Sequence, residues 1–150
     1  MTPNAVRINE INTLLQTLRT NLENEVSARK EVRTRLENLR RANLKLDDLL
    51  GRYSNFPDEY RNLHAPTPHL SFRGSRREAI EERLNSICDS LKKQQRWHNE
   101  HSRTIKNRIR TDENLENQHN VTINSINTQI SDLEKERRML QITESNLYMK

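Results

Sequence analysis

Residues 8–50 read INEINTLLQTLRTNLENEVSARKEVRTRLENLRRANLKLDDLL. Positions spaced by alternating steps of three and four residues are mostly apolar, which is typical of helices that pack in a left-handed supercoil. Polar residues occupy three of these heptad positions, Glu25, Arg29 and Asn43. The pattern predicts one long helix over about residues 4–50, with a single apolar seam. The apolar members of the seam are Ile8, Ile11, Leu15, Leu18, Leu22, Val32, Leu36, Leu39, Leu46 and Leu50.

The polar seam positions have their own expected roles. Glu25 and Arg29 lie four residues apart, so we expect them to pair with each other or with a partner helix. Asn43 is typical of a buried polar residue that fixes the register of paired helices.

The composition favours thin helical packing over a deep core. Hydrophobic and charged residues each make up 31% of the 150 residues, and the mean hydropathy is −1.07. Only 2 Gly and 4 Pro are present, whereas a β-rich fold needs many turn residues. A catalytic pocket needs a scaffold with depth. We therefore expect an all-α protein that is not an enzyme.

The helix-breaking residues divide the chain sharply. Apart from Pro3, every Gly and Pro lies between Gly51 and Gly74. Asn4 and Ser75 are suited to cap the two helical segments, and Gly51 is suited to the left-handed position that ends a helix. The predicted fold is a single all-α domain over residues 1–150: an elongated antiparallel helical hairpin with a connection at 51–74 and a helical segment at 75–147.

The second segment changes character along its length. It opens with apolar residues, continues with polar ones at Gln94, His98 and His101, and is almost wholly polar over residues 110–120. An apolar pattern then returns in what we interpret as a shifted register, at Ile123, Ile126, Ile130, Leu133, Leu140 and Leu147. The shift predicts two helical sections that are either bent or reversed near residues 110–120.

The predicted seams need partner helices, because one helix cannot bury its own apolar stripe. The first helix matches residues 75–121 in length, so the extra C-terminal section 122–147 either overhangs or folds back. An overhanging apolar stripe needs a partner, and we expect this section to bind helices of another chain, chiefly through Ile123, Ile126, Ile130, Leu133 and Leu140.

Positive charge gathers in residues 75–110, which hold 10 basic and 5 acidic residues. Within 92–110, we expect the Lys and Arg residues to be scattered around the helix rather than aligned in one stripe. Aromatic residues make up 4% of the chain, which leaves few rings for base stacking. Nucleic-acid binding is therefore a minor alternative, and a solvated helix face is the simpler interpretation.

The sequence offers no chemical site that stands out. His98 and His101 are one helical turn apart and could share a metal ion, but surface histidines explain them as well. Cys88 is expected to be a small buried apolar residue. We assign no catalytic residue, metal or cofactor. No apolar run is long enough for a membrane span and no signal peptide opens the chain, so we expect no membrane insertion and a cytoplasmic location.

The connection is rich in aromatic residues, with Tyr53, Phe56 and Tyr60 inside it and Phe72 near its end. Connections of this length are usually functional or disordered, and the rings argue against disorder. Two interpretations remain open. The rings either cap the end of the hairpin or form a docking surface for a partner.

Residues 71–74, Ser-Phe-Arg-Gly, lead directly into the second helical segment. This stretch resembles the W-x-G turn of the small helical-hairpin proteins of bacterial type VII secretion, with Phe72 at the Trp position and Gly74 at the Gly position. With its long connection and C-terminal section, the chain is similar to the accessory proteins that accompany LXG-type toxins. It departs from the family in the replaced Trp and in lacking the export signal, a Tyr followed four residues later by an acidic residue.

The resemblance implies a chaperone-like targeting partner. Such a protein binds the helical N-terminal region of a toxin, or another small helical secretion protein, and can be exported together with its partner. Two alternatives stay open: a self-associating structural coiled coil, which forms a homodimer, and a basic helical protein that binds nucleic acid.

Overall fold

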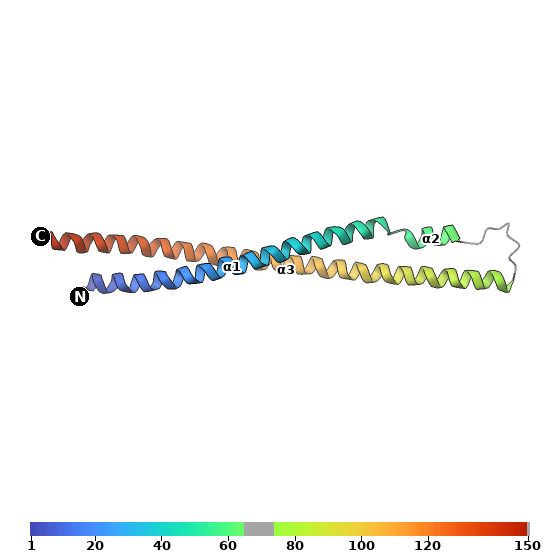
Figure 1. Cartoon of the computed structure of the whole chain (residues 1–150), viewed down its shortest axis with the longest axis horizontal. Helices are drawn as coiled ribbons and strands as arrows, with labels where there is room; N and C mark the ends of the chain where they lie inside the picture. The colour runs from blue at the N-terminus through green and yellow to red at the C-terminus, as the bar shows by residue number, and fades with distance from the viewer. Residues whose placement is uncertain (65–73, 150) are drawn as a thin grey trace. The chain divides into compact units, whose positions relative to one another are not determined.

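The computed structural model describes residues 1–64 and 74–149, and all regular secondary structure in these ranges is α-helical. The helices are α1 (Pro3–Arg52), α2 (Phe56–His64) and α3 (Ser75–Tyr148) (Figure 1). The all-α prediction is confirmed. The additional helix, α2, lies within the predicted connection.

The chain divides into two compact units, and α1 and α3 contribute to both. The terminal unit consists of Met1–Leu36 and Thr111–Lys150. The central unit is Glu37–Arg110 and includes α2. Each unit is described on its own below.

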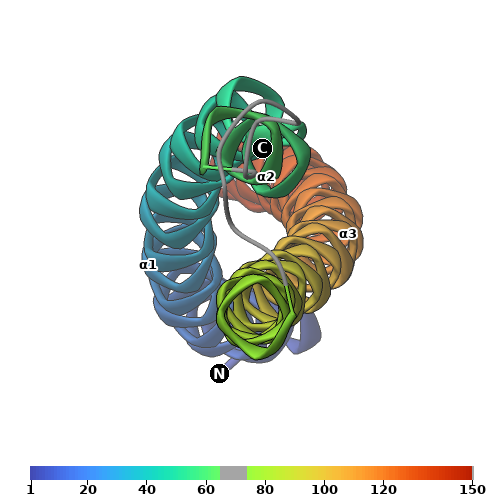
Figure 2. The ribbon, with the colours of Figure 1, turned by 90° about the vertical axis from the view of Figure 1, so that its right-hand side faces the viewer.

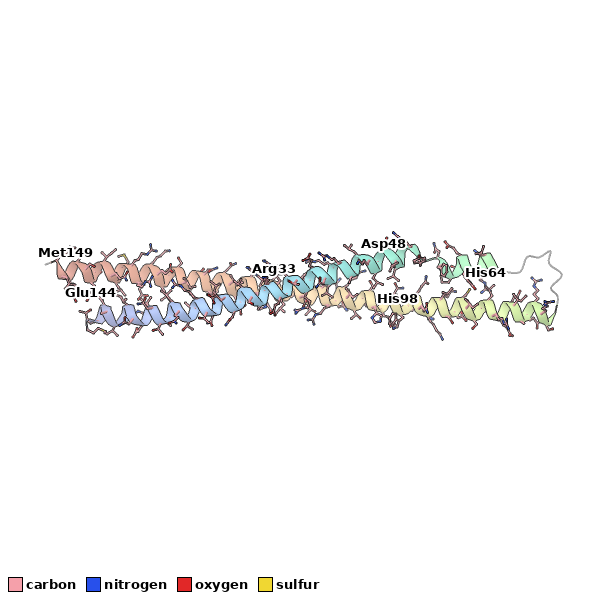
Figure 3. All side chains as sticks on the ribbon, in the orientation of Figure 1. Arg33, Asp48, His64, His98, Glu144 and Met149 are labelled. Carbon is pink, nitrogen blue, oxygen red and sulfur yellow. The ribbon has the colours of Figure 1, made fainter. Side chains whose placement is uncertain are left out.

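In the terminal unit, α1 and α3 pair in antiparallel orientation (Figures 1 and 2). Contacts to α1 move back along α3 as residue numbers rise: Arg7 pairs with Glu136, and Arg35 pairs with Asp112. Near the chain ends, Thr2 donates a hydrogen bond to Glu144, which is labelled beside the start of α1 in Figure 3. The buried apolar core is small and consists of Ile11, Leu15, Val32, Leu36, Ile123 and Ile126.

The central unit pairs its segments in the same antiparallel sense. Ser102 donates a hydrogen bond to Asp47 of α1, and further along the chain the Cys88 thiol donates one to the carbonyl of Pro57 in α2. Leu84 and Cys88 are buried here, so the expected burial of Cys88 is confirmed. Helix α2 therefore continues the packing against α3 after α1 has ended.

The predicted seam of α1 is confirmed, because all thirteen of its heptad positions from Ile8 to Leu50 are buried or half-buried. The predicted shift of register in α3 is wrong. One heptad pattern runs from Leu84 to Glu144, and every position except His98 is buried or half-buried. The interpretation followed apolar residues alone and missed polar residues that also lie on the packed side of α3, namely Gln95, Ser102, Asp112, Glu116 and His119.

The structure resolves two points about the C-terminal section. Residues 110–120 are helical throughout, so of the two alternatives, a bend or a reversal, the reversal is excluded. The section 122–147 does not overhang, since it pairs with the first part of α1 inside the terminal unit. Ile123 and Ile126 are therefore buried within this chain, and Ile130, Leu133 and Leu140 are half-buried. Their predicted binding to another chain thus loses its structural basis.

The helix ends also differ from expectation. The hydroxyl of Thr2, rather than Asn4, accepts a hydrogen bond from the Ala5 amide at 3.1 Å, so Thr2 caps α1. Gly51 lies inside α1 instead of ending it in a left-handed conformation. Ser75 is the first residue of α3, and Gly74 before it has a φ of +68°, a conformation that favours glycine.

Candidate functional site

The break between α1 and α2 is the most distinctive local feature of the central unit. Helix α1 ends at Arg52, and α2 begins at Phe56 with Pro57 in its first turn, where a missing amide hydrogen costs nothing. The side-chain amide of Gln95 on α3 donates hydrogen bonds to the carbonyls of Tyr53 and Ser54, at 2.6 and 2.9 Å. Gln95 thus fixes this turn against α3.

A pocket of about 300 Å³ lies at this break. It lies where α1 has ended and α2 has not yet begun, between the last seam residue of α1, Leu50, and Leu91 of α3. Most of its wall is apolar, and the polar side-chain groups are two amides, one imidazole and the phenol hydroxyl of Tyr53. The lining residues are Leu49, Leu50, Tyr53, Phe56, Pro57, Leu91, Gln94, Gln95 and His98.

The aromatic residues predicted from the sequence come together at this pocket. The rings of Tyr53 and Phe56 meet edge to face with centroids 6.0 Å apart, and Phe56 lies 6.2 Å from Tyr60. Tyr53 and Phe56 line the pocket, whereas Tyr60 supports Phe56 from the next turn of α2. Tyr53 is 54% exposed and Phe56 is 40% exposed, so both rings present apolar surface to solvent.

A second group of rings lies on α3. The ring of Trp97 is 3.9 Å from that of His101 and 4.9 Å from that of His98. His98, labelled in Figure 3, also lines the pocket. Trp97 is 57% exposed, so its indole adds to the apolar surface of the central unit. Across residues 1–64 and 74–149, no group of three or more His, Cys, Asp or Glu side chains is placed to hold a metal ion.

The terminal unit holds a polar layer instead of a pocket. Asp112 is fully buried and accepts two hydrogen bonds from the Arg35 guanidinium, at 2.7 and 3.1 Å. Its hydrogen bond with Asp112 raises the pKa of Arg35. One turn and two turns further along α3, Glu116 pairs with Arg33 and His119 pairs with Glu25. The polar stretch 110–120 is therefore paired with α1 through these three side chains of α3.

The sequence interpretation missed Asp112. The available signal was its heptad position, which faces α1 near a run of arginines, but an acidic residue among polar neighbours was interpreted as solvent-exposed. Glu25 and Arg29 pair across the helices rather than with each other, Glu25 with His119 and Arg29 with Asn120. Asn43 is half-buried, and its side-chain oxygen has no hydrogen-bond partner among the described residues.

The basic residues of the central unit are better ordered than expected. Arg96, Arg103 and Arg110 follow one another at intervals of seven residues on α3, and all three are exposed. Lys92 and Lys106 flank this column on the side of the seam. The order is partial, because Lys93 and Arg108 lie at about 60° and 120° around the helix from Arg96. The seven basic residues of 92–110 therefore do not form one stripe, as expected, although five of them share one side of α3.

The turn motif lies mostly outside the described residues. Phe72 is one of the residues that the structure does not describe, and Gly74 adopts the positive φ given above. Comparison of the chain with models of protein families, with curated proteins and with solved structures found no match. None of the helices in the described part of the chain is long and apolar enough to cross a membrane.

The pocket offers apolar surface and hydrogen-bonding groups but no arrangement of a nucleophile with a base. Its polar side chains are Gln94, Gln95 and His98, and Gln95 is already engaged with the turn. Such a pocket suits a bulky apolar side chain of another molecule.

Proposed function

We propose that this protein is a non-enzymatic interaction protein whose central unit binds a helical partner. The pocket at the break between α1 and α2 carries the proposal. Its exposed apolar side chains, Leu49, Tyr53 and Phe56, lie together on one side of the antiparallel helices. Clustered apolar and aromatic side chains of this kind are typical anchors of protein interfaces.

The specific form of the proposal is a targeting partner for the helical N-terminal region of an LXG-type toxin in bacterial type VII secretion. The resemblance at residues 71–74 supports it, and Gly74 adopts a conformation suited to a turn before a long helix. In this proposal the protein works in the bacterial cytoplasm, binds its partner there and can leave the cell with it.

The test is a tagged copy of the protein, isolated from its native cell after nuclease treatment, with bound proteins identified by mass spectrometry. We expect a larger protein with a helical N-terminal region, or small helical secretion proteins. The variant Leu49→Glu with Tyr53→Glu should lose this partner, because carboxylates in the pocket cannot be buried beside Leu91. Val121→Glu is the control, since Val121 is an exposed apolar residue of the terminal unit.

A partner recovered equally with the pocket variant and with the control would remove the pocket from the proposal. Recovery of this chain alone would replace the proposal with self-association, the second candidate. Half-exposed seams favour that candidate, because a third or fourth helix could still cover them. Sedimentation of the purified chain separates the two, since only self-association gives a dimer without another protein.

A further inference from the structure

The central unit carries a basic face on α3, which we define as Lys92, Arg96, Arg103, Lys106 and Arg110. All five side chains are exposed. Within each seven-residue interval the helix advances about 10.5 Å, so the three arginines form a straight column. Asn99 completes the face and is neutral.

The positive charge of this face is only partly balanced. Asp47 of α1 accepts hydrogen bonds from Lys106 and Ser102, at 3.3 and 3.1 Å. On α3 itself, Glu100 is the one acidic residue between positions 92 and 110, and the exposed Asp89 lies seven residues before Arg96 at the start of the same column. Five cations therefore share the face with three acids. By sequence, the central unit has 16 basic and 10 acidic residues, whereas the terminal unit has 10 and 11.

The regular spacing of the face matches one kind of ligand. A helix with Glu or Asp at every seventh position presents carboxylates at the same interval of about 10.5 Å. Such a helix also satisfies its own backbone hydrogen bonds, so it can lie along α3 without unpaired polar groups. Leu44 of α1, one turn before Asp47, is 70% exposed and offers an apolar contact for it.

Other ligands fit this face less well. The nearest large ring, Trp97, is turned about 100° around the helix from Arg96 and meets the His101 ring edge to face, so it does not lie on this face as a platform for bases. A second copy of this chain has acids in its terminal unit, but Glu116, Glu134 and Glu136 are paired with arginines there. The exposed Glu23 and Glu31 of α1 are eight residues apart, which does not match the seven-residue spacing of the arginine column.

We infer that the basic face binds an acidic amphipathic helix of a second protein, aligned along α3 so that its carboxylates meet the arginine column. This inference rests on the proposed function only in that the ligand is a protein helix. The face does not include the residues that line the pocket, so the two surfaces can be tested separately.

The test uses the full chain and a labelled synthetic helix of about 28 residues, long enough to be helical, with Leu at the seam positions and Glu at the flanking positions. A matched peptide carries Gln in place of Glu, and a DNA duplex and a single-stranded RNA serve as other ligands. Binding is measured by fluorescence anisotropy at low and at physiological salt. The variant is Arg96→Glu with Arg103→Glu and Arg110→Glu.

The control variant is Lys30→Glu with Lys45→Glu and Arg83→Glu, which changes the net charge equally at exposed positions outside the face. Circular dichroism establishes that both variants remain helical. We expect the acidic peptide to bind the unaltered chain at least about tenfold more tightly than the Gln peptide. The arginine variant should lose at least about tenfold in affinity, and the control should stay within about twofold.

Three results would overturn the inference. The first is an equal loss of affinity for the acidic peptide in the arginine variant and in the control variant. The second is tighter binding of DNA or RNA than of the acidic peptide, and the third is a dimer of the chain that the arginine variant abolishes and the control variant does not. The native partner distinguishes this inference from the proposed function. A partner that needs the pocket but is retained by the arginine variant leaves the proposed function standing and removes the basic face from it.

Discussion

The terminal and central units use the same antiparallel heptad arrangement but distribute charge differently. In the terminal unit, arginines of α1 meet acids of α3 across the helices, as Arg7 does with Glu136 and Arg19 with Glu134. In the central unit, α3 carries the basic face, and the break before α2 leaves a pocket. The comparison indicates that the residues beside the seam, more than the seam itself, decide how the charges are used. They either form ion pairs between the two helices or remain exposed for a partner.

The largest expected difference between the units comes from the small apolar core of the terminal unit. Ile126 is 8% exposed there, so Ile126→Asp should lower the free energy of unfolding by more than about 3 kcal/mol, because it removes an apolar side chain and buries a carboxylate. Urea unfolding followed by circular dichroism measures this. Ile142→Asp, at a position that is 56% exposed, is the control. Equal stability of the two variants would show that residues 122–147 do not pair within the chain.

The polar layer gives the next largest effect. Arg35→Met leaves Asp112 buried with a lost partner, and we expect unfolding to become easier by about 2–3 kcal/mol. Arg33→Met, whose partner Glu116 stays partly exposed, should cost less than about 1 kcal/mol. The double variant Arg35→Met with Asp112→Leu should recover most of the loss. If Arg35→Met lowered the free energy of unfolding no more than Arg33→Met does, the burial of Asp112 would not be what makes its ion pair important for stability.

The turn beside the pocket provides a smaller effect in the central unit. Gln95→Ala removes the two hydrogen bonds to the carbonyls of Tyr53 and Ser54, and should reduce stability by about 1 kcal/mol. Hydrogen exchange should quicken in α2 while the terminal unit stays unchanged. Gln94→Ala is the matched control, since Gln94 also lines the pocket. Unchanged exchange in α2 would mean that Gln95 does not hold the turn.

The smallest expected effect is a pH dependence of the terminal unit. The hydrogen bonds from Arg7 lower the pKa of Glu136 below its ordinary value of 4.5. Because the folded-state pKa is the lower one, the stabilisation is present above pH 4.5 and is lost as the pH falls through the folded-state pKa. Glu136→Gln should therefore differ from the unaltered chain near neutral pH and converge with it in acid. Thermal unfolding across this range measures the difference. If the two proteins still differed in stability in acid, the pH dependence could not be assigned to the Arg7–Glu136 pair.

Part of the fold followed from the sequence, and the reason is the strength of the heptad signal. In α1 the apolar residues from Ile8 to Leu50 mark the buried face almost without interruption, so helix and seam were both predicted correctly. In α3 the polar residues Ser102, Asp112 and His119 occupy the same face, and hydropathy alone could not identify them. Their burial depends on side chains of α1 that lie far away in the sequence.

The candidate site followed from the sequence only in part. The aromatic residues Tyr53, Phe56 and Tyr60 were singled out, but their arrangement around a pocket needs α2, and Leu91 and Gln95 of α3 complete it. Neither residue differs by type or spacing from many others in the chain. Only the antiparallel pairing brings them beside the break.

The sequence by itself determined that the chain is helical, where α1 and α3 begin and end within a few residues, and which side of α1 is buried. These properties depend on the helix propensity of neighbouring residues and on the heptad spacing of apolar residues, both of which are local in the sequence. The tertiary structure decided that residues 122–147 pair with the start of α1, that Asp112 is buried against Arg35, and that a pocket forms beside Tyr53. Those outcomes depend on contacts between residues that are distant in sequence. A local sequence pattern does not report the free energy of such contacts.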